Sequence, residues 1–237
     1  MRPALPLALL LSVSPALAAI TAPETPATAP AFDILSASVT RTGDQLTFAM
    51  SLAGQAGADR PVAGGALAGA PVWSYVWPTS LDPATVGFEG GTGILALAAT
   101  AHPDFDDTPL YDEDGDGDKA NDGADWHSHW VVLTPNEACG AGALSVRDIP
   151  EGETPKLPET WPGLPLFIDS PDIRPVIVGQ TIAVTLGLPE GTDTAALKFD
   201  GVTSALRVNQ SVHAPLLCVT DVWDVASGDL SLPGTVE

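Results

Sequence analysis

Basic residues are scarce in this chain, which has 9 Lys and Arg but 30 Asp and Glu among its 237 residues. The formal net charge at neutral pH is therefore −21. Nucleic acids and anionic lipids are bound chiefly through Lys and Arg, so a surface this acidic disfavours both as partners. The same charge attracts cations, and metal ions are the partners that it favours.

Long apolar runs are also missing, and no stretch reaches the roughly 18 consecutive apolar residues that a membrane-spanning helix needs. A shorter apolar run, Leu5 to Val13, follows Arg2 and precedes the small residues Ala16-Leu17-Ala18. This order is typical of a secretory signal peptide and its cleavage site. We therefore expect residues 1–18 to be an export signal and the protein to be periplasmic or secreted.

Sulfur-containing residues are few. Two cysteines, Cys139 and Cys218, stand far apart in a chain expected in an oxidising compartment, which predicts a disulfide rather than a pair of metal ligands. Closing a loop of that length would stabilise the fold by about 4 kcal/mol in the chain-entropy description. Met50 is the only methionine after the signal, which disfavours a copper(I) site, because copper(I) prefers thioether ligands.

Signatures of catalysis are absent too. The chain has no nucleophile elbow, phosphate loop, dinucleotide fingerprint, haem attachment sequence or paired-cysteine motif. Gly90-Gly91-Thr92-Gly93 lacks the spacing of a nucleotide-binding loop and precedes an apolar segment, so it predicts a turn. The sequence thus gives no positive indication of an enzyme.

No segment shows an extended helical period, whereas 23 prolines and 23 glycines separate short segments with strand-like alternation. One such segment, Gln45 to Leu52, places every second apolar residue on one face. Ten or eleven strands of this kind predict an all-β fold, a single antiparallel β-sandwich with long loops, over residues 32–225. Residues 19–31 read as a Pro/Ala/Thr-rich linker and residues 226–237 as a flexible tail.

Two local features of these strands carry further expectations. Asp200-Gly201 predicts a tight hairpin turn, because both residue types tolerate a positive φ. Trp73, Tyr75 and Trp77 share one strand face, where they would either fill the core or form a stacking platform for sugar rings.

The most concentrated feature is a run of ten carboxylates in the 22 residues from Asp104 to Asp125. Carboxylates this close repel one another unless a cation lies among them. Within the run, Asp112-x-Asp114-x-Asp116-Gly117-Asp118 resembles the front half of an EF-hand or dockerin calcium loop. The resemblance implies three carboxylate ligands, a turn at the glycine and a backbone carbonyl ligand from Asp118.

The run departs from an EF-hand in two respects. Its twelfth position is Gly123 instead of a bidentate glutamate, and Pro109 before it and a strand after it leave no flanking helices. We therefore expect an EF-hand-like calcium loop without helices, closed by Asn121, Asp122 or Asp125; the alternative is a solvated acidic loop. The predicted calcium ligands are Asp112, Asp114, Asp116, Asp118, Asn121 and Asp122.

A histidine pair follows the acidic run. On a strand, Asp125, His127 and His129 share one face, and Trp126, Ser128 and Trp130 share the other. Imidazole and carboxylate ligands favour zinc or copper(II). His213 and His102 are candidates to join this site. His213 precedes the strand of Cys218, which the disulfide would draw toward the segment after His129, and His102 stands at the start of the acidic run. The predicted metal ligands are His127, His129, Asp125, His213 and His102; the alternative is a set of structural, hydrogen-bonded histidines.

These features predict an exported metal-binding protein with a structural calcium loop and a histidine-centred zinc or copper site. Its role would be storage, delivery or sensing of the metal, and another periplasmic protein would be a natural partner. One alternative is a metal-dependent enzyme in which His127, His129 and His213 hold the ion and leave a position open for water. The other is a calcium-dependent carbohydrate-binding or adhesion module that contacts sugar through the aromatic residues of 73–77.

Overall fold

The computed structural model describes residues 19–112, 115–119 and 121–237, so the export signal expected at residues 1–18 lies outside the described residues. The described chain is almost entirely antiparallel β-structure, with three short 3-10 turns. The all-β prediction is therefore confirmed.

The strands and turns have the following bounds. The strands are β1 Ile20–Thr21, β2 Ile34–Thr42, β3 Gln45–Leu52, β4 Pro71–Pro78, β5 Ile94–Ala101, β6 His127–Pro135, β7 Leu144–Val146, β8 Ile168–Asp169, β9 Val176–Val178, β10 Thr181–Gly187, β11 Lys198–Phe199, β12 Val202–Val208, β13 Leu217–Val225 and β14 Gly234–Thr235. The 3-10 turns are η1 Pro83–Val86, η2 Asp122–Ala124 and η3 Glu137–Cys139.

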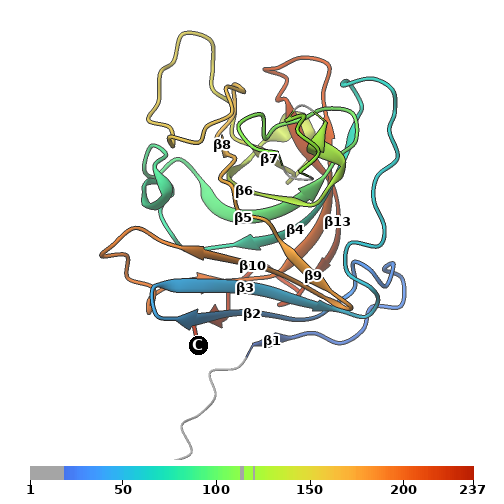
Figure 1. The fold of residues 1–237 in the computed structure, drawn as a ribbon, viewed down its shortest axis with the longest axis vertical. Helices are drawn as coiled ribbons and strands as arrows, with labels where there is room; N and C mark the ends of the chain where they lie inside the picture. The colour runs from blue at the N-terminus through green and yellow to red at the C-terminus, as the bar shows by residue number, and fades with distance from the viewer. Residues whose placement is uncertain (1–18, 113–114, 120) are drawn as a thin grey trace, which may run out of the picture.

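Six strands close into a barrel in the order β5-β4-β12-β13-β7-β6, because β6 pairs back onto β5. β8 adds to the barrel through β6. A separate sheet in the order β1-β2-β3-β10-β9 lies beneath β4 and β5 in Figure 1. The expected plain β-sandwich is thus corrected to a closed barrel with a second sheet packed on it. Alternating side chains fit both architectures equally well, so strand patterning did not separate them.

The alternation along β4 shows how this arrangement makes two cores. Val72 and Val76 face the barrel interior, where they pack with inward residues of β6 and β12. Tyr75 and Trp77 face outward and pack against residues of β2, β3 and β10, such as Phe48. Each fully buried large side chain contributes roughly 1.5–3 kcal/mol, so both faces of β4 stabilise the fold.

The aromatic residues of β4 therefore belong to the core between the barrel and the second sheet. Tyr75 and Trp77 are completely buried, and Trp73 packs edge-on against Phe32 and Trp223. Buried rings cannot stack on a sugar, which corrects the alternative in which this stripe forms a carbohydrate platform.

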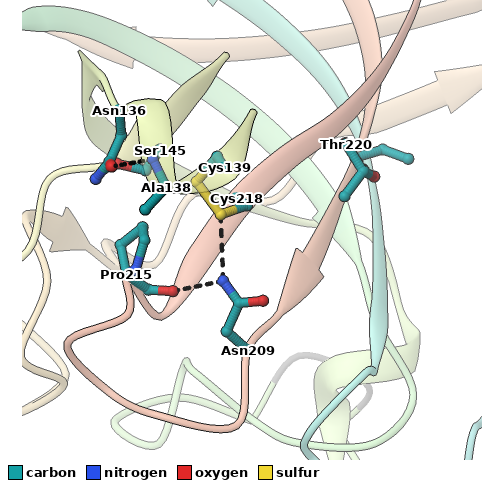
Figure 2. The surroundings of a disulfide bond; sticks show 9 residues. Asn136, Ala138, Cys139, Ser145, Asn209, Pro215, Cys218 and Thr220 are labelled. Carbon is teal, nitrogen blue, oxygen red and sulfur yellow. Dashed lines mark hydrogen bonds between the residues drawn. A yellow bond between two sulfur atoms is a disulfide. The ribbon is translucent and has the colours of Figure 1, made fainter. Parts of the chain in front are cut away.

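The disulfide joins the weakest seam of the barrel. β7 pairs with β13 through a single residue pair, Ser145 opposite Cys218. Cys139 in η3 is bonded to Cys218 across 5.4 Å between the Cα atoms, and Figure 2 shows the bond beside Ser145 and Asn209. The covalent link thus supplements a strand pairing that is itself only one residue long.

Asp200-Gly201 does not form the expected hairpin, because β11 pairs with β14 while β12 pairs with β4 and β13. The Asp200 carboxylate is buried and accepts hydrogen bonds from Ser227. Gly201 packs so closely on Ala37 that an added Cβ would lie 2.6 Å from that side chain. Both residues therefore serve a close contact between elements instead of a tight turn.

The two terminal segments contact the second sheet. β1 lies within residues 19–31 and pairs with β2, and β14 lies within residues 226–237. At the chain end, Glu237 exchanges backbone hydrogen bonds with Val39 and Arg41.

Candidate metal centre

Strand β6 turns His127 and His129 toward the barrel interior. His127 is opposite Thr100 and His129 opposite Ala98 on β5, while Trp130 points outward into the other core. The alternation predicted for this segment therefore places both imidazoles on the inner face of one strand. Both rings are almost fully buried, with 2% and 1% of the surface of His127 and His129 exposed.

The segment that follows β5 brings two more buried polar residues to the same place, His102 and Asp107, which are 1% and 4% exposed. The His102 ring stacks on Phe105 with 3.9 Å between ring centres. The amide of His102 donates to the carbonyl of Gly123, 2.7 Å away. A Cβ at Gly123 would lie 2.0 Å from the Phe105 carbonyl oxygen, so only glycine allows the two ends of this segment to pack this closely.

The three histidines present their Nε2 atoms to a single carboxylate oxygen. Asp107 Oδ1 lies 3.1 Å from His102 Nε2, 3.1 Å from His127 Nε2 and 3.2 Å from His129 Nε2. The Nε2 atoms of His102 and His127 are 3.0 Å apart. Within the described part of the chain, these four side chains form the one group of His, Cys, Asp and Glu that is close enough to hold a metal ion.

The other ring nitrogen of each histidine faces a hydrogen-bond acceptor. His102 Nδ1 lies 3.0 Å from the carbonyl oxygen of Phe105, and His127 Nδ1 lies 2.8 Å from that of Asp125. His129 Nδ1 contacts the Asp169 carbonyl at 3.3 Å and the Ser170 hydroxyl at 3.1 Å. A carbonyl oxygen only accepts, so each Nδ1 carries the hydrogen and each neutral ring points an Nε2 lone pair at the centre.

Lone pairs from three imidazoles and a carboxylate oxygen repel one another when nothing positive lies between them. Burial lowers the pKa of His129, against the opposing attraction of Asp107, and so favours its neutral form. Burial alone would raise the pKa of Asp107, but positive charge on His129 and His102, together with hydrogen bonds from His102 and His127, outweighs it and holds that pKa well below the usual range. An ionised carboxylate among imidazole lone pairs is the protonation state that a metal ion requires.

The distances suit a tetrahedral ion. Bonds of about 2.0–2.1 Å to nitrogen or oxygen place neighbouring ligand atoms roughly 3.3 Å apart. The three oxygen–nitrogen separations and the His102–His127 separation are close to this value, and all four ligand atoms lie within 4.8 Å of one another. His129 Nε2 is the second indication, because it is buried and points at the Asp107 carboxylate oxygen, 3.2 Å away. Backbone and hydroxyl partners at Nδ1 are the supports that metal-binding histidines commonly have. The cluster can therefore hold a transition-metal ion such as zinc or copper.

Two of the residues predicted to bind this metal lie elsewhere. Asp125 precedes β6, and its carboxylate pairs with Arg60 at 2.7 Å, while its carbonyl supports His127. His213 is 42% exposed and pairs with Asp148 at 2.7 Å. The ligand set of the predicted enzyme alternative, which includes His213, is therefore not assembled in this structure.

Sequence reasoning missed Asp107 and Ser170. Asp107 stands among nine other carboxylates, and only the path of the loop selects it. Ser170 follows β8, where its hydroxyl donates to the Asp107 carbonyl at 2.6 Å and accepts from His129 Nδ1. The neighbouring sequence identifies neither residue as part of the site. Their contacts are long-range: Ser170 and Asp107 are 63 residues apart in the chain, and Ser170 and His129 are 41 residues apart.

The residues predicted to bind calcium lie outside this cluster, and Asp114 lies outside the described residues. The Asp112 carboxylate accepts from the amides of Gly115 and Gly117. The Asp116 carboxylate accepts from the Asp118 amide and the Asn121 side chain, whereas Asp122 is buried. The calcium loop therefore stays a prediction.

Comparisons of the chain with protein-family models, with curated proteins and with solved structures find no match in any of the three. Among the residues that the structure describes, no helix is both long and apolar enough to cross a membrane. The candidate metal centre is thus the feature from which a function can be argued.

Proposed function

We propose that this protein binds one transition-metal ion, zinc or copper(II), through His102, His127, His129 and Asp107. The observation that carries the proposal is the approach of three buried Nε2 atoms to within 3.2 Å of one carboxylate oxygen. Imidazole and carboxylate are the ligands that both ions accept.

Binding, rather than catalysis, is the role that this ligand set favours. Four protein ligands complete a tetrahedral shell, whereas catalytic zinc sites keep three protein ligands and an open position for water. The ion would also be shielded, since every ligand is at least 96% buried. We therefore propose storage, delivery or sensing of the metal as the function.

We also propose that the protein is exported, because the expected signal at residues 1–18 would take it to an oxidising compartment where the Cys139–Cys218 disulfide persists. Calcium binding in the loop from Asp112 to Asp122 is a separate proposal. It is supported by Gly115 and Gly117, whose φ angles of 78° and 95° turn the backbone tightly around the Asp112 carboxylate. A calcium titration of the intact protein and of Asp116→Asn, each already loaded with zinc, tests it.

Elemental analysis of untagged protein after dialysis tests the metal centre. We expect about one zinc or copper ion per chain, and loss of that ion in His127→Ala and in Asp107→Asn. The matched controls His213→Ala and Asp125→Asn change the same residue types outside the cluster and should retain the metal. Stoichiometric metal in His127→Ala, or loss of metal in His213→Ala alone, would show that the site is elsewhere.

A further inference from the structure

The interior of the barrel contains a cavity of about 80 Å³ that reaches the metal centre. Asp107 and His129 line it, whereas His102 and His127 do not. Phe105, whose ring stacks on His102, also lines the cavity, so the cavity meets the cluster at Phe105, Asp107 and His129.

The wall of this cavity is otherwise almost wholly apolar. Its polar residues besides Asp107 and His129 are Ser74, Thr100 and Ser204. Ser74 and Ser204 are bonded to each other, with 2.8 Å between their hydroxyl oxygens, and the Thr100 hydroxyl lies 3.1 Å from His127 Nε2. The hydroxyls are thus engaged with protein atoms, and the polarity available to a ligand is concentrated at the metal end.

The cavity approaches solvent through another part of the molecule. Val222 on β13 and Leu230 in the C-terminal segment both line it and are 52% and 44% exposed. Leu230 has a φ of 58°, a left-handed conformation that costs a branched residue of this kind roughly 1 kcal/mol or more. The fold therefore holds an apolar side chain at this opening despite a backbone cost.

We propose that the cavity binds a small, uncharged, predominantly apolar molecule directly beside the metal ion. The proposal rests on the proposed metal-binding function and adds to it a ligand class. An apolar wall rejects ions, because a charge moved there loses its hydration without gaining a partner. A small apolar cavity accepts apolar guests, which gain dispersion contacts with the surrounding side chains. The size of the cavity limits the guest to a few non-hydrogen atoms.

Xenon is the probe, because it is uncharged, apolar and small. We expect saturable xenon binding by NMR of ¹²⁹Xe with the zinc-loaded protein, and no saturable binding of iodide at the same site. Exchange of zinc for paramagnetic cobalt(II) should strongly accelerate the relaxation of bound xenon, since the ion would lie next to the guest. Xenon that binds without this acceleration would place the guest away from the metal and contradict the proposal.

Ala98→Leu tests the location, because Ala98 lines the cavity and pairs across the strands with His129. We expect it to weaken xenon binding at least ~10-fold while one zinc ion per chain is retained. Val222→Trp, at a half-exposed position that tolerates a large side chain, should slow or weaken xenon entry. The control Val62→Trp adds the same bulk at a position that is 84% exposed and outside the cavity, and should leave xenon binding unchanged.

The outcomes separate the two proposals. Zinc bound by the histidines without saturable xenon binding contradicts the ligand proposal alone. Equal xenon affinity of Ala98→Leu and the parent protein would also contradict the ligand proposal alone. A protein that takes up xenon but no zinc or cobalt contradicts the metal function, and the cavity is then an apolar space without an ion beside it.

Discussion

Asp107 is the residue on which the proposed metal centre depends, because its carboxylate faces three imidazole nitrogens at once. The hydrogens on the three Nδ1 atoms are fixed by backbone carbonyls and by one hydroxyl. The ring orientations are therefore set before any ion arrives. Preorganised ligands lose little conformational entropy on binding, which favours high affinity.

Ser170 is the side chain that positions two of the ligands, since it contacts both His129 Nδ1 and the Asp107 carbonyl. We predict that Ser170→Ala lowers zinc affinity by roughly 10- to 100-fold without removing a ligand. Competition with a chelator of known affinity measures the change. Ser128→Ala is the control. Ser128 is buried beside His129 on β6, but its hydroxyl makes no hydrogen bond to the described residues. Equal losses in both variants would refute a positioning role.

The raised pKa of Tyr75 predicts how the stability of the fold changes at alkaline pH. Burial raises its pKa from 10.0 to about 12, against a lowering hydrogen bond from Gly57. Between these two pH values the unfolded chain loses the phenolic proton while the folded protein keeps it. Stability therefore falls as pH rises from 10 to 12, by up to roughly 3 kcal/mol. Chemical denaturation at each pH should show this fall, and Tyr75→Phe should remove that part of it; an unchanged slope in the variant would contradict the prediction.

At the level of strands, the two faces of β6 contribute to different parts of the structure. The inner face carries His127 and His129, and the outer face carries Trp130 into the core shared with the second sheet. Its length allows pairing with β5 on one side and with β7 and β8 on the other. Two of the four proposed ligands, His127 and His129, therefore stand on a strand that is paired along both of its edges.

The seam between β7 and β13 is the least anchored, with one residue pair and the Cys139–Cys218 disulfide. We predict that replacing both cysteines by alanine lowers the free energy of unfolding by about 4 kcal/mol, as expected for a bridge spanning 79 residues. Denaturant titration of the oxidised protein and of the double variant measures it. A reducing agent should destabilise the parent protein by a similar amount and leave the variant unchanged. Identical stabilities would show that the disulfide is dispensable at this seam.

The sequence predicted which neighbouring residues share a face of a strand. Alternation placed His127 and His129 on one face and Trp130 on the other, because strand geometry depends only on neighbouring residues. It extended the same face back to Asp125, which lies before the strand begins and pairs with Arg60 instead. Asp107 was not distinguishable among its acidic neighbours, because its position depends on Ser170 and on a loop folded against Gly123.

For the molecule as a whole, the proposed metal centre and the apolar cavity occupy the interior of one closed barrel. The all-β class followed from turns and alternation, but the described residues form 14 strands instead of the expected ten or eleven, and closure was not predicted. Closure depends on β7, a strand of three residues that pairs with both of its neighbours. The sequence of so short a strand does not identify its partners, which are chosen by tertiary contacts.

The most direct test is anomalous diffraction from crystals of the metal-loaded protein at the zinc or copper absorption edge. We predict one strong peak within bonding distance, about 2.0–2.2 Å, of the Nε2 atoms of His102, His127 and His129 and of the Asp107 carboxylate. A peak beside His213 and Asp148, a peak only in the loop from Asp112 to Asp122, or no ordered ion among the three histidines would contradict it.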